Sequence, residues 1–595
     1  MKHFLLFILV VMIGEVFAQQ IPFAFTPENL SPEIRVEELE EDLFIYTFSF
    51  PVDSLTEPIE IKWESLFNNS YNYWTSGKKG FVKPVWSSGL VTSYGTSQAP
   101  VASLFDNDNQ NKLTFALSDA LNTIQLSSGI IEETANLLNT VRIQPAAFLS
   151  KDKYEISLRI DKRNIPYWQA LQETSLWWAE MERYKPMSVS VEAKRPMYST
   201  WYSFHQNIDV GDVLKNCRIA KTIGCDAIIV DDGWQTLDNN RGYAFTGDWK
   251  PERIPQMKEF VDGVHELDMK FLLWYSVPYV GKFSKAYQQF SDKVLSFDSR
   301  KGSAVLDPRY PEVRKYLVDT YVKALAEWNL DGFKLDFVDS FKSSDQSLNE
   351  GMDFVNVNEA TDKLMTEIKE TLMAIKPDVL IEFRQSYIGP VMRKYGNMFR
   401  AGDCPISIND NRIKTTDIRL LAGNTATHSD MIMWHPEAEV EDAASQLLNV
   451  FFSVPQISVR LDQIPEEHIA MLKFWLGFWE NNSEVLLGSE LEAYYPNFNY
   501  PLLIARGGNK LIASVYESDL IINLDESAAE MARVNIINAS GQEQVSVRSE
   551  TKLLGTLKTY DCVGKVVQKK KIELKGLYQF EVPKSGLLEI EIEKR

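Results

Sequence analysis

Hydrophobic and polar positions change their pattern twice along the 595-residue chain. Up to about residue 185, short apolar segments such as 44–48, 113–117 and 154–160 alternate with turns rich in Gly, Asn, Ser and Pro. Successive side chains of a strand point to opposite faces, so period-two alternation at this spacing predicts antiparallel strands of a β-sandwich. A short helical stretch, from about residue 166 to residue 177, is expected to connect this sandwich to the rest of the chain.

From about residue 197, β-type runs alternate with amphipathic stretches that are mostly about 12 to 20 residues long. Eight such strand–helix units in about 290 residues predict a (β/α)8 TIM barrel. The competing fold, an open doubly wound sheet, would carry a Gly-rich nucleotide-binding turn, which this sequence lacks. The expected strands are 199–205, 226–231, 270–276, 331–337, 378–384, 397–402, 430–434 and 455–460. The expected helices are 210–223, 257–268, 310–329, 356–376, 388–395, 412–423, 440–452 and 465–480.

Strand patterns return after about residue 485, at 502–505, 511–516, 577–582 and 587–592. They predict a small C-terminal β-sandwich. The expected fold class is therefore α/β, with a central barrel between two β-domains. The expected division is a signal peptide at 1–18, an N-terminal β-sandwich at 19–185, the catalytic barrel at 186–484 and the C-terminal β-sandwich at 485–595.

The first twenty residues have the pattern of a secretory signal. Lys2 and His3 give a basic start, residues 4–13 are apolar, and small residues at Val16 and Ala18 have the spacing of a cleavage site. A membrane anchor is the alternative, but a hydrocarbon core of about 30 Å needs about 20 apolar residues. We therefore expect an exported chain, periplasmic or secreted, with no stable membrane insertion.

Composition and charge exclude several classes of protein. With 45% hydrophobic and 24% charged residues the chain has an ordinary globular balance, which excludes disordered, collagen-like and multi-span membrane proteins. Its 62 basic and 82 acidic residues give a net charge of −20, which repels phosphate backbones and argues against a nucleic-acid partner.

The cysteines do not indicate disulfides or a metal. They show no CxxC pairing, and four cysteines in so long a chain are no disulfide framework, so we expect buried free thiols. No Cys/His ligand cluster, HExxH motif, P-loop or GxGxxG motif is present, so neither a metal nor a cofactor is indicated. The four residues are Cys217, Cys225, Cys404 and Cys562.

The fourth expected strand carries the most informative chemistry. Phe333, Leu335 and Phe337 share one face by period-two alternation, and this apolar face should pack against the helices. Lys334 and Asp336 then point together into the barrel lumen. The alternative is that the lysine only neutralises the aspartate, but such a buried pair is seldom better than an apolar filling. A functional pair is therefore favoured.

The second expected strand ends in two carboxylates, Asp231 and Asp232, followed by Gly233 and Trp234. They could simply cap the following helix in a solvated loop. A large ring at a barrel mouth, however, indicates a ligand against which the ring packs. Carboxylates beside such a ring suit a sugar, because they accept hydrogen bonds from its hydroxyls while the ring packs against its apolar face. Further rings expected at the same rim are Trp201 on the first strand, Trp274 on the third and Trp434 on the seventh.

The fifth and sixth strands end at Arg384 and at Arg400, which is followed by Asp403. Catalytic groups of these barrels lie at the C-terminal ends of strands, so Asp403 should face Asp336 across the lumen. Two carboxylates, one ionised and one protonated, are what glycosidic hydrolysis requires. We expect Asp336, beside Lys334, to keep a low pKa as the nucleophile. Asp403 would need a raised pKa to act as the acid.

Three motifs together resemble the signatures of glycoside hydrolase family 36 and its clan relatives, the α-galactosidases or melibiases. They are Asp231-Asp232-Gly233-Trp234, Lys334-Leu335-Asp336 and Arg400-Ala401-Gly402-Asp403. The resemblance implies a retaining mechanism with Asp336 as nucleophile, and galactose hydroxyls held by Asp231 and Asp232. It also implies sugar contacts by Lys334 and Trp274, and we expect Arg384 and Arg400 among the substrate contacts.

The acid/base residue and the exact sugar remain open at this point. The family pattern places three residues between Arg and the catalytic Asp, whereas two separate Arg400 from Asp403, so Asp410 is the alternative acid. The function expected from the resemblance is an exo-acting α-galactosidase with a carbohydrate as its partner. The alternatives are a sister-family glycosidase for an α-glucoside, α-N-acetylgalactosaminide or β-L-arabinoside, or a transglycosylase on the same scaffold. A pure sugar binder would have no use for Lys334 and Asp336 facing a second carboxylate.

Overall fold

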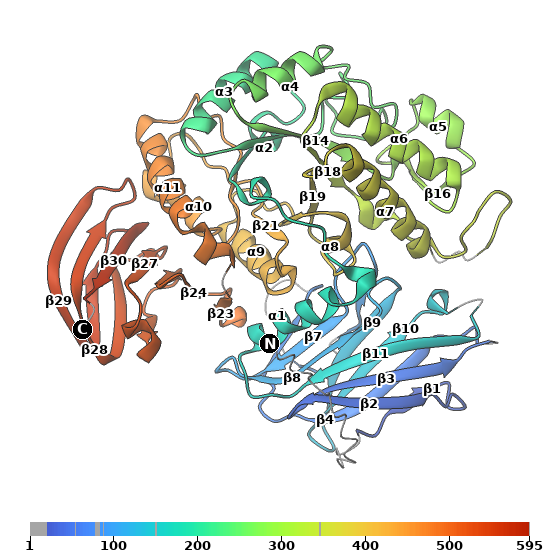
Figure 1. The fold of residues 1–595 in the computed structure, drawn as a ribbon, viewed down its shortest axis with the longest axis horizontal. Helices are drawn as coiled ribbons and strands as arrows, with labels where there is room; N and C mark the ends of the chain where they lie inside the picture. The colour runs from blue at the N-terminus through green and yellow to red at the C-terminus, as the bar shows by residue number, and fades with distance from the viewer. Residues whose placement is uncertain are drawn as a thin grey trace, which may run out of the picture.

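The computed structural model describes residues 21–593, except 54, 78–83, 87–88, 149–150, 344–346 and 489. The expected signal peptide at 1–18 lies outside the described residues. Figure 1 shows three regions along the chain: N-terminal β-sheets in blue, a helix-covered barrel in green to orange, and a C-terminal sheet in red. In the described part of the chain, no helix is long and apolar enough to cross a membrane. All four cysteines are buried and free, as expected.

The N-terminal region is a sandwich of two antiparallel sheets, as the alternation predicts. Its core holds large rings, such as Trp63 and Phe115, whose centroids lie 5.1 Å apart in an edge-to-face arrangement. Helix α1 (Tyr167–Ala179) then leads to the barrel. One sheet has the order β1 (Ala24–Thr26), β4 (Ile59–Leu66), β10 (Asn136–Ile143), β9 (Ile124–Ile131) and β6 (Val91–Ser93). The other has the order β2 (Glu33–Glu40), β3 (Leu43–Pro51), β11 (Lys153–Asp161), β8 (Asn111–Leu117), β7 (Val101–Phe105) and β5 (Asn72–Thr75).

The central region confirms the predicted (β/α)8 barrel. Eight parallel strands form one sheet. Two isolated β-bridges, His428 to Val454 and Ile432 to Ile457, bring this sheet close to a closed barrel. In chain order the strands are β12 (Met197–Ser199), β13 (Ala227–Val230), β14 (Lys270–Ser276), β18 (Gly332–Asp336), β19 (Leu380–Arg384), β20 (Met398–Arg400), β21 (Ala426–His428) and β22 (Gln456–Ile457). The helices are α2 (Trp201–Phe204), α3 (Val210–Thr222), α4 (Met257–His265), α6 (Pro311–Trp328), α7 (Val357–Ile375), α8 (Met392–Tyr395), α9 (Ile408–Ala422), α10 (Val440–Leu448) and α11 (Glu466–Gly488).

Three details of the barrel differ from the prediction. The first strand ends at Ser199, and Trp201 opens helix α2 instead of lying on a strand. The seventh strand is 426–428, and the expected strand at 430–434 is a buried loop that makes only an isolated bridge. An unpredicted insertion follows the third strand and forms a small antiparallel sheet. It consists of β15 (Tyr279–Gly281), α5 (Lys285–Phe290), β16 (Val294–Asp298) and β17 (Ser303–Leu306).

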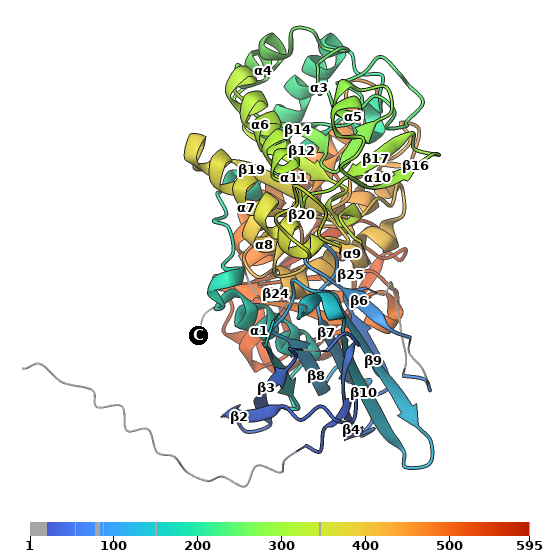
Figure 2. The ribbon, with the colours of Figure 1, turned by 90° about the vertical axis from the view of Figure 1, so that its right-hand side faces the viewer.

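The C-terminal region is β-rich, as predicted, but its strands are all joined in one sheet instead of two. Figure 1 shows this sheet beside helices α10 and α11, and Figure 2, turned by 90°, shows it behind the place where the barrel and the N-terminal sheets meet. The sheet order is β23 (Leu491–Tyr494), β24 (Leu502–Gly507), β25 (Lys510–Val515), β27 (Arg533–Asn538), β30 (Gly586–Ile592), β28 (Gln544–Tyr560) and β26 (Ile521–Leu524), and β29 (Val566–Glu581) pairs with β28.

One buried carboxylate joins the three regions. Asp417 of α9 accepts hydrogen bonds at Oδ1 from Trp74 Nε1 of β5 (2.9 Å) and from the hydroxyl of Tyr500 (2.6 Å), which precedes β24. Burial raises the pKa of Asp417 to about 6, although the hydrogen bonds from Tyr500 and Trp74 act in the opposite direction. The junction therefore favours a protonated, neutral side chain.

Asp417→Asn is expected to stabilise the protein near pH 7.5. A folded-state pKa above the ordinary value of 3.8 gives stability that is complete below about pH 4 and is lost as the pH rises through about 6. At 1.36 kcal/mol per pKa unit, this loss is on the order of 3 kcal/mol, and asparagine avoids it while keeping the acceptor oxygen. Urea unfolding at pH 4 and pH 7.5 measures the effect, with Asp410→Asn, an exposed position of the same helix, as the control. A variant clearly less stable than the wild type at pH 7.5 would contradict the expectation.

Candidate active site

Strand β13 delivers Asp231 to the barrel lumen. The backbone N–H of Asp231 donates to Thr200 Oγ1 (2.9 Å), which fixes the chain where the strand ends. Its carboxylate forms an ion pair with Lys334 Nζ of β18, and both side chains are at most 5% exposed. Lys334 thus lies on the lumen face of its strand, as the alternation predicts. Asp231 is the partner of this lysine.

Asp232 points to a different set of partners. Its carboxylate accepts hydrogen bonds from Gln206 Nε2 (2.9 Å) and Gln235 Nε2 (2.7 Å). Burial, together with the charge of Asp231, raises the pKa of Asp232 to about 6, and the two amide donors limit the rise. The turn requires Gly233, because its φ is +116° and a Cβ would lie 2.6 Å from the Cα of Gln206.

Trp234 does not form the expected sugar platform. It is fully buried, its indole N–H donates to the backbone oxygen of Trp274 (2.9 Å), and its ring packs against Trp249 and Trp328. The left-handed turn at Gly233 directs the chain behind the sheet, so the ring fills the space between strands and helices. A sugar cannot reach it.

Two of the other three predicted rim tryptophans, Trp201 and Trp434, also differ from the expectation. Trp434 is 7% exposed, lies in the loop after β21, and donates from Nε1 to His468 Nδ1 (3.1 Å). Trp201 is half-buried and its ring contacts that of His205 at a centroid distance of 4.8 Å. Trp434 is therefore part of the packing, and only Trp201 keeps a partly open ring.

Asp336, at the end of β18, is held by three side chains, from strand β14, strand β19 and the loop after β19. Trp274 of β14 donates from Nε1 to Oδ2 (3.1 Å), Arg384 of β19 donates from Nε to Oδ1 (2.7 Å), and the Tyr387 hydroxyl donates to Oδ1. Burial acts to raise the pKa of Asp336, but the charges of Arg384 and Lys334 and these hydrogen bonds hold it well below the usual range. The carboxylate is therefore ionised and fixed in orientation, in the direction expected of a nucleophile.

Two of these contacts were not predicted in these roles. Arg384 was expected to bind substrate, whereas here its guanidinium is paired with the nucleophile candidate. Tyr387 gave no signal in the sequence, since it stands in a loop after β19.

Phe337 was expected on the helix-facing side with Phe333, but its φ of +63° ends the alternation. Its ring instead lies beside Tyr279 (4.9 Å between centroids), at the mouth of the site.

Asp403 follows β20 and is half exposed. Its Oδ1 accepts a hydrogen bond from Arg400 Nη2 (3.0 Å). The buried Lys414 of α9 donates from Nζ to the backbone oxygens of Gly402 and Asp403 (3.0 Å each), which anchors the loop that carries the carboxylate.

The pKa of Asp403 is shifted opposite to the expected direction. Burial acts to raise the pKa, but the charges of Arg400, Lys334 and Arg384 together hold it below the usual value. The prediction of a raised pKa considered only burial and the partner carboxylate, and it missed the three surrounding cations. In this state Asp403 is ionised.

Arg400 is a buried structural cation instead of the expected substrate contact. It is 1% exposed, and it pairs with Asp430 and with Glu382 of β19 as well as with Asp403. Asp430 and Glu382 are fully buried, and desolvation raises the pKa of each. Sequence reasoning missed both acids, although Glu382 could have been found as a charge between the apolar residues Ile381 and Phe383.

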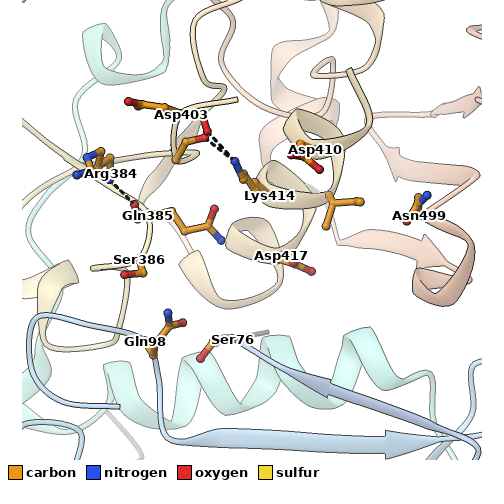
Figure 3. A pocket seen from close by; sticks show the side chains of 13 residues that line it. Ser76, Gln98, Arg384, Gln385, Ser386, Asp403, Asp410, Lys414, Asp417 and Asn499 are labelled. Carbon is orange, nitrogen blue, oxygen red and sulfur yellow. Dashed lines mark hydrogen bonds between the residues drawn. The ribbon is translucent and has the colours of Figure 1, made fainter. Parts of the chain in front are cut away.

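A cavity of about 510 Å³ opens beside Asp403, at the meeting point of the three regions. We call it the junction cavity (Figure 3). Arg384 and Asp403 line its barrel side, and the alternative acid, Asp410, lines it from the first turn of α9. The remaining lining residues are Ser76, Gly77, Gln98, Gln385, Ser386, Gly402, Ile413, Lys414, Asp417 and Asn499. Among the residues that the structure describes, no three His, Cys, Asp or Glu side chains are grouped to hold a metal ion.

The chain is similar to known α-galactosidases. The melibiase family model matches residues 175–414, which hold the barrel as far as α9. The α-galactosidase Mel36A of Lactobacillus acidophilus is 31% identical over 127 residues, which are 20% of this chain and 17% of the relative. The "A type blood alpha-D-galactosamine galactosaminidase" of Flavonifractor plautii is 26% identical over 275 residues, 40% of this chain and 24% of that protein. Each match thus spans at most about a quarter of the relative's length.

The structural similarity extends beyond the barrel. A variant of the GH36 α-galactosidase AgaA from Geobacillus stearothermophilus, in complex with 1-deoxygalactonojirimycin, matches with a TM-score of 0.63 and 13% identity over 95% of this chain and 81% of that one. A (β/α)8 barrel between β-domains, with carboxylates converging in its lumen, is an arrangement on which glycosidic hydrolysis can be carried out. The barrel is thus similar to the melibiase family model over residues 175–414, and the fold of the chain is similar to that of GH36 α-galactosidases.

Proposed function

We propose that the chain is an exported, retaining exo-glycosidase that hydrolyses terminal α-galactosides of oligosaccharides or polysaccharides. The observation that carries the proposal is the arrangement around Asp336, which is kept ionised by Arg384 and Lys334 and oriented by Trp274. The similarity to GH36 α-galactosidases supports the sugar, and the pattern of residues 1–18 supports export. Asp231 and Asp232 are the candidates for binding galactose hydroxyls.

The proposed reaction has two steps. Asp336 attacks the anomeric carbon while the bond to the leaving oxygen breaks, and Asp403 gives its proton to that oxygen. Water then attacks the same carbon, Asp403 takes a proton from the water, and Asp336 leaves as a carboxylate. Each attack inverts the anomeric carbon, so the overall configuration is retained.

The environment of Asp403 suits the second step of this reaction. A general base must be ionised, and the charges of Arg400, Lys334 and Arg384 keep the pKa of Asp403 below its usual value. For the first step Asp403 must take up a proton. That uptake becomes less favourable as the pH rises above its pKa, so this geometry favours turnover on the acid side of neutrality.

A second candidate is hydrolysis of α-N-acetylgalactosaminides or of a related galactosamine sugar. The match of 275 residues to the Flavonifractor plautii protein, longer than that to Mel36A, is the observation that favours it. Both sugars share the axial hydroxyl at C4 and differ at C2. Comparing aryl α-galactoside with aryl α-N-acetylgalactosaminide as substrates distinguishes the two candidates.

The wild-type protein is expected to cleave aryl α-galactoside at least about a hundredfold better than the matching α-glucoside, as expected for about 3 kcal/mol. Glucose presents an equatorial hydroxyl at C4, so a buried carboxylate aimed at the axial position would lose its hydrogen bond to the sugar. At least one of Asp231→Ala and Asp232→Ala should remove much of this ratio of kcat/KM values.

Asp238→Ala is the matched control, because Asp238 is a more exposed carboxylate of the same loop. It should keep the wild-type ratio. A wild-type preference for glucosides, or an unchanged ratio in both Asp231→Ala and Asp232→Ala, would argue against the galactose assignment.

A further inference from the structure

The loop that carries Asp403 is held at two points, one before and one after that residue. Arg400 ends strand β20, and Cys404 directly follows Asp403. Both points contact the same side chain, that of Asp430 in the loop after β21. Asp430 accepts a hydrogen bond at Oδ1 from Arg400 Nη1 and another at Oδ2 from the backbone N–H of Cys404 (2.6 Å). One carboxylate thus holds the loop on both sides of the proposed acid/base residue.

Asp430 is itself fixed by partners from other elements. Its backbone N–H donates to Asn411 Oδ1 of α9 (3.0 Å), and Asn411 Nδ2 donates to the backbone oxygen of Asp430 (3.0 Å). The hydroxyl of Tyr202, in α2, donates to Oδ2 of Asp430 (2.9 Å). The residue is fully buried. Asp430 is therefore a fixed point of the barrel, and the loop around Asp403 is attached to it.

The contacts of Asp430 suit a carboxylate and no other side chain of its size. All three groups that bond to its side chain are donors: Arg400 Nη1, the Cys404 N–H and the Tyr202 hydroxyl. An ionised carboxylate accepts at both oxygens, whereas an amide has one acceptor oxygen and an NH2 group that only donates. An asparagine at this position would therefore lose its bond either to Arg400 or to Cys404.

Arg400 connects Asp430 to Asp403 through two different nitrogens. Nη1 donates to Asp430, and Nη2 donates to Oδ1 of Asp403 (3.0 Å). The guanidinium group is planar and rigid, so fixing Nη1 also fixes the direction in which Nη2 points. In the described part of the chain, no residue bonds to Oδ2 of Asp403. The contacts thus fix one oxygen of Asp403 and leave the other available to a substrate.

We propose that Asp430 is a positioning residue, which holds Arg400 and the Cys404 N–H so that Asp403 presents its free oxygen to the leaving oxygen of the substrate. Asp430 does not touch the substrate in this role and acts only through residues 400–404. The inference rests on the proposed glycosidase function. It adds to the site a residue from the loop after the seventh barrel strand, where the sequence pattern predicted a strand.

Asp430→Asn tests this role with two substrates that share galactose. Arg400 keeps two acidic partners, Asp403 and Glu382, so the variant leaves no buried charge unpaired and should fold. It should lower kcat/KM for an α-galactosyl disaccharide by about tenfold or more, because a displacement of about 1 Å in the acid can cost about a hundredfold. For a dinitrophenyl α-galactoside, whose leaving group needs no proton, kcat/KM should stay within about threefold of the wild-type value. Asp430→Ser, which has a smaller side chain, should show the same split.

The Asp403→Asn background distinguishes positioning from a general loss of structure. If Asp430 acts only through Asp403, adding Asp430→Asn to Asp403→Asn should lower kcat/KM for the disaccharide by no more than a further factor of about two, since the losses of residues that act as a unit do not add. Thermal unfolding of each variant is measured beside the kinetics. Tyr202→Phe is the matched control, because it removes the third donor to Asp430 and leaves both contacts with the loop. It should keep the wild-type ratio of the two kcat/KM values.

Three results would overturn the role of Asp430: equal losses on both substrates in the two Asp430 variants, an unchanged disaccharide activity, or a full additional loss in the Asp403→Asn background. A result that makes Asp410 the acid would also overturn it, and would leave the α-galactosidase function intact. A wild-type protein that cleaves neither α-galactoside would instead refute the proposed function itself.

Discussion

Asp336→Ala is expected to lower kcat for α-galactosides by about 10,000-fold or more while the protein stays folded. In the proposed mechanism the loss is this large because the variant has no group to form the covalent intermediate, and the other catalytic groups cannot act without it. The fold should survive because Lys334 keeps its ion pair with Asp231, and Arg384 is 23% exposed and can be solvated. Thermal unfolding measured beside the kinetics separates the two effects.

Chemical rescue identifies the role of Asp336 more specifically. A small anion such as azide can enter the space of the missing carboxylate, so it should restore part of the turnover and give a β-galactosyl azide. Proton NMR of the wild-type reaction should show the α-anomer released first, as double inversion requires. Asp339→Ala, which removes a neighbouring carboxylate, should lose far less activity. Near-normal turnover in Asp336→Ala, or a β-anomer as first product of the wild type, would argue against this mechanism.

Much of the barrel could be predicted because the buried residues of its strands and of its helices recur along the sequence with different periods. The third strand lies at 270–276, as expected. Its apolar run is bounded by polar residues, so the positions at which the strand begins and ends are well defined. The lumen position of Lys334 followed from alternation alone. In a parallel sheet, alternation fixes the face of a side chain wherever the backbone stays extended.

The parts that could not be predicted depend on backbone turns or on distant partners. Phe337 and Trp234 follow strand ends where φ becomes positive, at Phe337 itself and at Gly233, so their rings leave the face that alternation assigns. The ion pair between Asp336 and Arg384 joins residues 48 positions apart. Its geometry follows from the rotation of two side chains, which no local pattern specifies.

The pKa of Asp403 is a further example. Its direction depends on three cations brought together by the ends of β18, β19 and β20, and the sequence shows each of them only as an isolated basic residue. The junction cavity could not be predicted for a related reason. The residues that line it come from three regions of the chain, and each region was predicted separately.

Asp403→Asn is expected to affect substrates according to their leaving groups. A sugar alkoxide is a poor leaving group and needs a proton, so kcat/KM for an α-galactosyl disaccharide should fall by about 100-fold to 10,000-fold, the typical range for general acid catalysis. A dinitrophenolate leaves without protonation, so kcat/KM for the activated aryl α-galactoside should fall by less than about tenfold. The ratio kcat/KM reports the first chemical step, which separates the acid role from the later base role.

The base role gives an independent signal in the same variant. Removal of the galactosyl group from Asp336 then lacks a group to activate water, so the activated substrate should show a burst of phenolate followed by slow turnover. Azide needs no base and should accelerate that slow phase. Asp410→Asn is the decisive comparison, because Asp410 lines the same cavity from helix α9. It should behave like the wild type with both substrates. If Asp410→Asn shows the split by leaving group and Asp403→Asn does not, the acid is Asp410, and Arg400 and Lys414 then hold Asp403 for a structural purpose.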